Sequence, residues 1–147
     1  MTTNQGDPAK LDSQYRTMLI LWLAFLSTIV IYLFLSFVLP RHDEPPNQLL
    51  LVFNIMSPLL VAVSFGVKRK FLSRSVETQD VRLVSTALVA AAAICEAAAL
   101  LGLLDLLVAH DRYYFVLIAF SFLGLLLHFP KRSHLEAASF KSTHALN

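Results

Sequence analysis

Glu96 is the residue whose type and surroundings in this chain are best suited to chemistry. It is the one charged residue between Leu83 and Leu104, and alanines flank it on both sides. An acidic group within a bilayer costs about 2.5–3.5 kcal/mol on insertion scales, so such a residue normally faces a helix bundle or water. A carboxyl there could bind or relay a proton or a monovalent cation. It could equally stay protonated and lock neighbouring helices together by hydrogen bonding.

Two polar residues in an earlier apolar segment are the predicted partners of Glu96. Asn54 and Ser57 stand three residues apart near the middle of residues 49–67, so they share a helix face. In an antiparallel neighbour of the helix that carries Glu96, we expect both to lie at the depth of the carboxyl and to orient it. Pro58 also displaces the hydrogen bond to the carbonyl oxygen of Asn54, which leaves an acceptor there. Further members of this predicted intramembrane polar layer are Ser27, Thr28 and Ser121.

Four long segments with almost no charge are the elements that would position these residues. Hydrophobic residues make up 56% of the 147 residues and charged residues 15%, whereas soluble domains carry about 25% charged residues. A helix needs roughly 20 apolar residues to cross the hydrocarbon core of a bilayer. The sequence therefore excludes a soluble enzyme and predicts an all-α membrane protein, an up-down bundle of four transmembrane helices. The predicted spans are residues 18–39, 49–67, 83–104 and 113–129.

Lysine and arginine are distributed unequally between the two sides of this predicted bundle. Ten of them fall in the two tails and in the loop between the second and third spans, and two fall in the other loops. The positive-inside rule therefore predicts that both termini are cytoplasmic. The expected organisation is a cytoplasmic tail at 1–16, a transmembrane domain at 17–129 and a second tail at 130–147, in a bacterial inner (plasma) membrane. Within the tails, residues 1–14 and 133–147 are expected to be disordered.

The remaining polar residues give weaker expectations. Ser75 is a candidate N-cap for the third helix, and Cys95 is expected to be an inert packing residue. Asp105 is expected near the outer boundary, as an interfacial cap or as the partner of Arg112, and an interfacial position is expected for His128. No residue spacing predicts a metal site, a P-loop or a dinucleotide fingerprint. We therefore expect no cofactor, no nucleic-acid partner and no enzymatic activity.

The stretch from Glu96 to Leu103 reads Glu-Ala-Ala-Ala-Leu-Leu-Gly-Leu, with a glycine six residues after the glutamate. It resembles the ion-carrying helix of the proteolipid (c) subunit of rotary ATP synthases. The divergent resemblance covers residues 49–107 as a hairpin with a basic cytoplasmic loop, although residues 49–67 contain Gly66 alone where that family has regularly spaced glycines. The resemblance implies that Glu96 is the protonated or ion-binding residue.

Two functions follow from these observations. In the first, the chain is a structural, assembly or interaction component, and its alanine-rich third span packs in the bilayer against a second copy or another membrane protein. Glu96 is then a protonated hydrogen-bond donor that holds neighbouring helices together. In the second, the chain is a c-like protein that binds or relays protons or a monovalent cation, with Glu96 titrating and Asn54 and Ser57 as orienting ligands.

Overall fold

The computed structural model describes residues 8–39, 48–109 and 114–139, and these residues form helices and short turns. In chain order, the elements are α1 (Pro8–Val38), α2 (Gln48–Thr78), α3 (Arg82–Leu104), a π-helical turn η1 (Asp105–Ala109), α4 (Tyr114–Leu127) and α5 (Arg132–Ser139). The prediction of an all-helical protein is therefore confirmed for the described residues.

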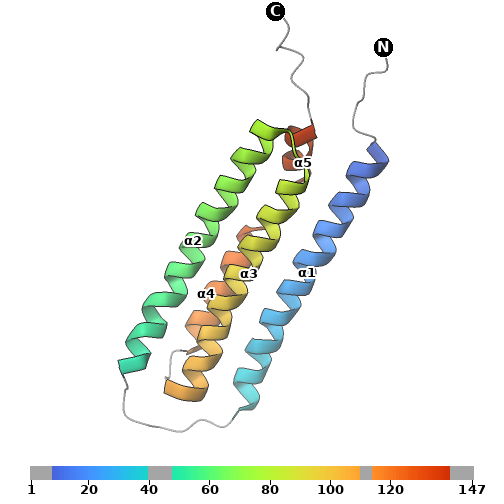
Figure 1. Ribbon diagram of the computed structural model, residues 1–147. Helices are drawn as coiled ribbons and strands as arrows, with labels where there is room; N and C mark the ends of the chain where they lie inside the picture. Colours follow the sequence, from blue (N-terminus) through green and yellow to red (C-terminus); the bar gives the residue numbers. More distant parts are fainter. Residues whose placement is uncertain (1–7, 40–47, 110–113, 140–147) are drawn as a thin grey trace, which may run out of the picture.

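Helix α3 occupies the centre of the bundle. In Figure 1, α1 and α2 lie on opposite sides of it and α4 lies behind it, and α3 packs against all three helices. The alanines of α3 make this possible, since Ala87, Ala91, Ala92, Ala98 and Ala99 are all buried and small residues let helix backbones approach closely. The chain is thus built around the helix that carries Glu96.

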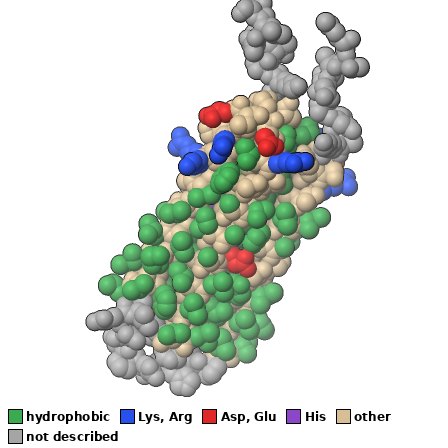
Figure 2. All heavy atoms as spheres, in the orientation of Figure 1, with side chains coloured by type: hydrophobic (Ala, Val, Ile, Leu, Met, Phe, Trp, Pro, Cys, Tyr) green, Lys and Arg blue, Asp and Glu red, His purple; other side chains and the backbone are tan. Residues whose placement is uncertain are grey.

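Within the part of the chain that the structure describes, three helical segments are long and apolar enough to cross a membrane: Leu11–Val38, Leu51–Thr78 and Arg82–Val108. A fourth span exists if α4 and α5, which meet at a bend of 46°, count as one. Large hydrophobic side chains cover much of the outer surface, as Figure 2 shows, while lysine and arginine gather toward one end. This pattern is that of a membrane protein, because apolar side chains that face lipid need no protein cover.

Helix α2 is much longer than the predicted span and runs through most of the predicted cytoplasmic loop. Ser75 is therefore not the N-cap of the third helix; it lies within α2, where its hydroxyl donates to the carbonyl oxygen of Leu72 at 2.7 Å. The turn to α3 is short and begins at Gln79, whose φ of 53° is left-handed. Asp80 then accepts a hydrogen bond from the backbone N–H of Arg82 at 2.9 Å and caps the start of α3.

Both predicted tails are more ordered than expected. Helix α1 begins at Pro8, so the expectation of disorder over residues 1–14 is wrong from residue 8 onward. Helix α5 occupies much of the second tail, and its buried residues Leu135 and Ala138 hold it against the bundle. Disorder over residues 133–147 is accordingly wrong for residues 133–139.

Candidate functional site

Glu96 lies half-buried on α3 and is contacted from α1. The hydroxyl of Tyr32 donates a hydrogen bond to Oε1 of Glu96 at 3.3 Å. This is long for an O–H···O bond, which is usually about 2.5–3.0 Å. Tyr32 was not among the predicted partners, although the depth argument applied to Asn54 could have found it. Tyr32 stands about 5 Å outward of the middle of the span 18–39, and Glu96 stands about 4 Å outward of the middle of its own.

Ser57 has a different partner from the one predicted. It is fully buried, and its hydroxyl donates to the carbonyl oxygen of Ala98 at 3.2 Å. Ala98 comes two residues after Glu96, which places it about 200° around α3, on nearly the opposite side of the helix. The Ser57 hydroxyl therefore joins α2 to the backbone of α3, and the carboxyl is held from the α1 side.

Asn54 and Ser57 do not lie at the height along the bundle that was predicted for them relative to Glu96, and the tight turn after α2 is the reason. Since α2 and α3 are antiparallel and Ser57 lies beside Ala98, Asn54 lies beside roughly the position of Leu101. That is about 7 Å along α3 from Glu96 at a rise of ~1.5 Å per residue. The prediction placed the midpoints of the two apolar segments at the same height. The relative height of α2 and α3 is instead set by the turn at residues 79–81.

The other residues of the predicted polar layer bond within their own helices. The hydroxyls of Ser27, Thr28 and Ser121 donate to the carbonyl oxygens of Leu23, Ala24 and Leu117 at 2.8, 3.1 and 2.9 Å. Each satisfies its donor locally and thereby lowers the cost of a hydroxyl in an apolar segment.

A second polar cluster, which the sequence did not predict, joins α2, α3 and the end of α4. We call Ser64, Cys95 and His128 the Ser64 network; all three are fully buried. The Ser64 hydroxyl oxygen lies 2.7 Å from Nε2 of His128 and 3.5 Å from the thiol of Cys95. His128, which was expected at the cytoplasmic interface, is thus covered by protein, and Cys95 is a hydrogen-bonding residue as well as a packing one.

The hydrogen-bond directions in the Ser64 network define the state of the histidine. Ser64 has a single hydroxyl proton, which it donates to the carbonyl oxygen of Val61 at 2.6 Å. Its oxygen is then the acceptor for both the Cys95 thiol and Nε2–H of His128. These directions assign His128 the tautomer with its proton on Nε2, so Nδ1 is an acceptor. Nδ1 is buried and has no hydrogen-bond partner among the described residues. The ring of Phe65 packs beside the imidazole with centroids 4.4 Å apart.

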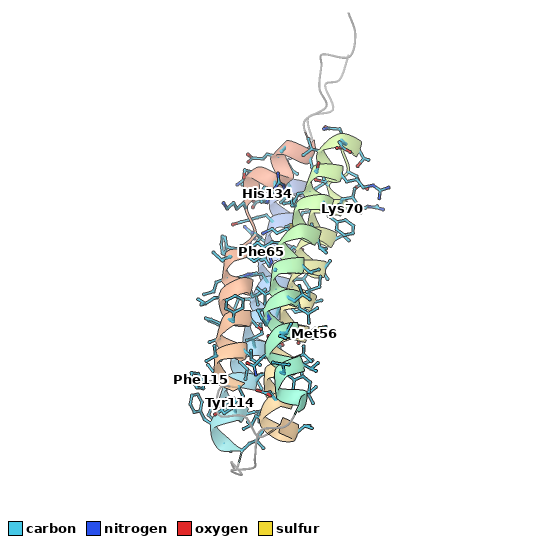
Figure 3. All side chains as sticks on the ribbon, turned by 90° about the vertical axis from the view of Figure 1, so that its left-hand side faces the viewer. Met56, Phe65, Lys70, Tyr114, Phe115 and His134 are labelled. Carbon is cyan, nitrogen blue, oxygen red and sulfur yellow. The ribbon has the colours of Figure 1, made fainter. Side chains whose placement is uncertain are left out.

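Aromatic side chains and charged side chains mark opposite ends of the bundle. In Figure 3, Lys70 and His134 lie at one end, and Tyr114 and Phe115 lie at the other. Tyr114 joins α4 to α1 there, since its hydroxyl donates to the carbonyl oxygen of Ser36 at 3.1 Å.

Asp105 lies at the first position of η1, directly after the predicted end of the third span, and it is fully buried by the protein. A π-helical turn admits one extra residue into a helix and commonly marks a functional or strained position. Arg112, the partner considered for it, lies outside the described residues.

Among residues 8–39, 48–109 and 114–139, no group of three or more histidine, cysteine, aspartate or glutamate side chains could hold a metal ion. The described polar groups considered above are one half-buried carboxyl beside a phenol, at Glu96 and Tyr32, and one buried imidazole beside a hydroxyl and a thiol, in the Ser64 network.

Comparison with protein families, with curated proteins and with solved structures finds no match to this chain. The resemblance to the proteolipid hairpin rests on the residues quoted above. One of them, Gly102, has a structural reason within this chain: a methyl group added there would lie 2.8 Å from Cγ1 of Ile118. The glycine lets α3 and α4 pack closely.

Proposed function

We propose that this chain is a structural or assembly component of a bacterial inner (plasma) membrane, and that Glu96 marks the face on which a partner helix docks. The proposal includes four transmembrane spans, of which the fourth is residues 113–129 and contains α4, while α5 belongs to the cytoplasmic tail. It also places both termini in the cytoplasm, on the strength of the ten-to-two distribution of lysine and arginine.

The half-exposed carboxyl of Glu96 carries this proposal. The carboxyl has one long hydrogen bond from Tyr32, and the residue is partly exposed at the surface of the bundle. Three neighbours on the same face of α3, at the i, i+4 and i+7 positions of a helix, are exposed as well: Ala93, Ala97 and Leu100. We call Ala93, Glu96, Ala97 and Leu100 the α3 docking face.

The physical reason is the cost of leaving this face against lipid. An acidic side chain at that depth costs about 2.5–3.5 kcal/mol, and a neighbouring helix that supplies a hydrogen bond removes part of this cost. Alanine on both sides of the carboxyl lets the backbone of such a helix come close. The occupant is a second copy of this chain or a different membrane protein with a polar group at the same depth.

Photocrosslinking in intact membranes tests this proposal. A photoreactive residue at Ala97 should give a discrete protein adduct, and the same residue at Ala119, which is exposed on α4, should give none. An adduct of twice the 16.4 kDa chain identifies a second copy, and any other mass identifies a different partner. Glu96→Gln should retain the adduct because an amide still donates and accepts, whereas Glu96→Ala should weaken it severalfold. Lipid adducts alone at both positions would refute the proposal.

A second candidate function is proton or monovalent-cation binding at Glu96, as in the resemblance to the proteolipid subunit. The observation that favours it is the Tyr32 hydroxyl beside Oε1, since a phenol can hold a carboxyl in one orientation. Asn54 and Ser57 were the predicted ligands, but the Ser57 hydroxyl is bonded to the backbone of α3. A carbodiimide should modify Glu96, and sodium ions or high pH should protect it. Glu96→Gln is the blank, and modification unaffected by both treatments would exclude this candidate.

A further inference from the structure

A groove of about 500 Å³ lies between α1 and α3 at the end of the bundle where lysine and arginine gather. Ligand sites are commonly about 300–1,000 Å³. The lining of the groove is polar at one end and apolar at the other. Gln14 of α1 and Arg82 of α3 line it with polar groups, and Leu21, Val89 and Ala93 line it with apolar ones.

The polar residues of this groove stand at the level where a head group would lie. Gln14 and Arg82 both come just before the apolar runs that begin at residues 18 and 83. From Arg82 down to Ala93 the groove follows eleven residues of α3, about 16 Å at a rise of ~1.5 Å per residue. Half of a hydrocarbon core of about 30 Å is about 15 Å. The groove therefore has the length of one leaflet.

The charges around the polar part of the groove favour an anion. Among the described residues, the guanidinium of Arg82 takes part in no ion pair. Of the neighbouring carboxylates, Asp12 pairs with Arg16 and Arg132, and Asp80 accepts a hydrogen bond from the backbone N–H of Arg82 at the start of α3, so neither forms an ion pair with the Arg82 guanidinium.

We propose that this groove binds one anionic glycerophospholipid of the leaflet on that side. Arg82 and the Gln14 amide donate to the phosphate group, and an acyl chain runs along Val89 and Ala90 to Ala93. Basic pockets between transmembrane helices on the cytoplasmic side are a known setting for such head groups. This site shares Ala93 with the α3 docking face and otherwise consists of different residues.

Lipid retention by the purified full-length chain tests the proposal. Phosphatidylglycerol and phosphatidylcholine with identical acyl chains are added in mild detergent, and bound lipid is counted by native mass spectrometry. We expect the chain to retain phosphatidylglycerol about fivefold better, the gain from one basic side chain near a membrane surface. Arg82→Gln should abolish this preference and keep the weaker binding of phosphatidylcholine. The matched control is Arg74→Gln, an equal change of charge on the exposed surface of α2.

A second pair of variants tests the apolar part of the groove. Ala90→Phe fills it and should reduce the binding of both lipids severalfold, whereas Ala97→Phe, outside the groove, should leave lipid binding unchanged and disturb only the α3 docking face. Equal retention of the two lipids, or a preference that survives Arg82→Gln, would overturn the proposal. So would competition by inorganic phosphate at millimolar concentration, because it would show a site for free anions. Arg82 is exposed, so its variant decides the question even if Ala90→Phe does not fold.

Discussion

Replacement of Gly102 by alanine is expected to destabilise the bundle, although alanine is the better helix former. The added methyl group would lie 2.8 Å from Cγ1 of Ile118, 3.1 Å from Cβ of Leu117 and 3.2 Å from the backbone nitrogen of Ile118. Two of these three atoms are fixed to the α4 backbone, so rotation of a side chain cannot make room. Helix α4 must move away from α3.

The size of this effect follows from two opposing terms. Overpacking a close contact costs about 1–3 kcal/mol, and glycine-to-alanine substitution within a helix gains about 1 kcal/mol. The net loss in the free energy of unfolding is therefore about 0–2 kcal/mol, and relative to Gly66→Ala the loss is about 1–3 kcal/mol. Gly66→Ala provides the matched control, because nothing lies within 4 Å of a methyl group at Gly66. It should gain up to about 1 kcal/mol.

Unfolding of the full chain by sodium dodecyl sulfate in mixed micelles measures both changes. The chain has a single tryptophan, Trp22, which is buried and packs edge-on against Phe129 with ring centroids 5.2 Å apart. Its fluorescence therefore reports the packing of α1 on the end of α4, and circular dichroism reports helix content. If Gly102→Ala proves as stable as Gly66→Ala, the close approach of α3 and α4 at this point is refuted.

Two further substitutions probe the buried hydrogen bonds between helices. Ser64→Ala leaves His128 without the hydroxyl that it contacts at 2.7 Å, and this should lower the free energy of unfolding by about 1–3 kcal/mol. The control Ser73→Ala, on the exposed face of α2, should change the free energy of unfolding by less than about 0.5 kcal/mol. Equal effects from the two serines would contradict the Ser64 network. Trp22→Phe removes the bond from Nε1–H to the carbonyl oxygen of Leu125 at 3.0 Å and should cost about 0.6–1.7 kcal/mol, the range for polar contacts between membrane helices. An unchanged midpoint, measured by circular dichroism, would show that this bond does not hold α1 to α4.

The sequence predicted the helices well where hydropathy alone sets their limits. The span at residues 83–104 corresponds to α3 at Arg82–Leu104, because a charged residue borders one side of this apolar run. The prediction of helix limits failed where a helix continues beyond the apolar run. Residues 68–78 are polar and basic, and a transmembrane pattern carries no signal for helix outside the bilayer, yet α2 continues through them.

The same helical extension accounts for the part of the site that was predicted wrongly. The heights of Asn54 and Ser57 relative to Glu96 depend on where the chain turns, and the turn lies at the far end of the predicted loop. His128 was assigned to the interface because Phe129, Pro130 and a basic pair follow it. It packs instead against Ser64 and Phe65 of α2, a tertiary contact that local pattern does not encode.

The unbroken course of α2 past the apolar segment has a mechanical consequence. From Lys68 to Thr78 the helix adds about 16 Å at ~1.5 Å per residue, and the turn after it is only three residues long. The hairpin therefore has no soft hinge between its apolar half and its charged tip. A tilt imposed near Glu96 must swing that tip, which begins about 21 Å away along the axis of α3 at ~1.5 Å per residue. Events near Glu96 therefore reach the charged end of the bundle as a displacement of Arg69, Lys70 and Arg74.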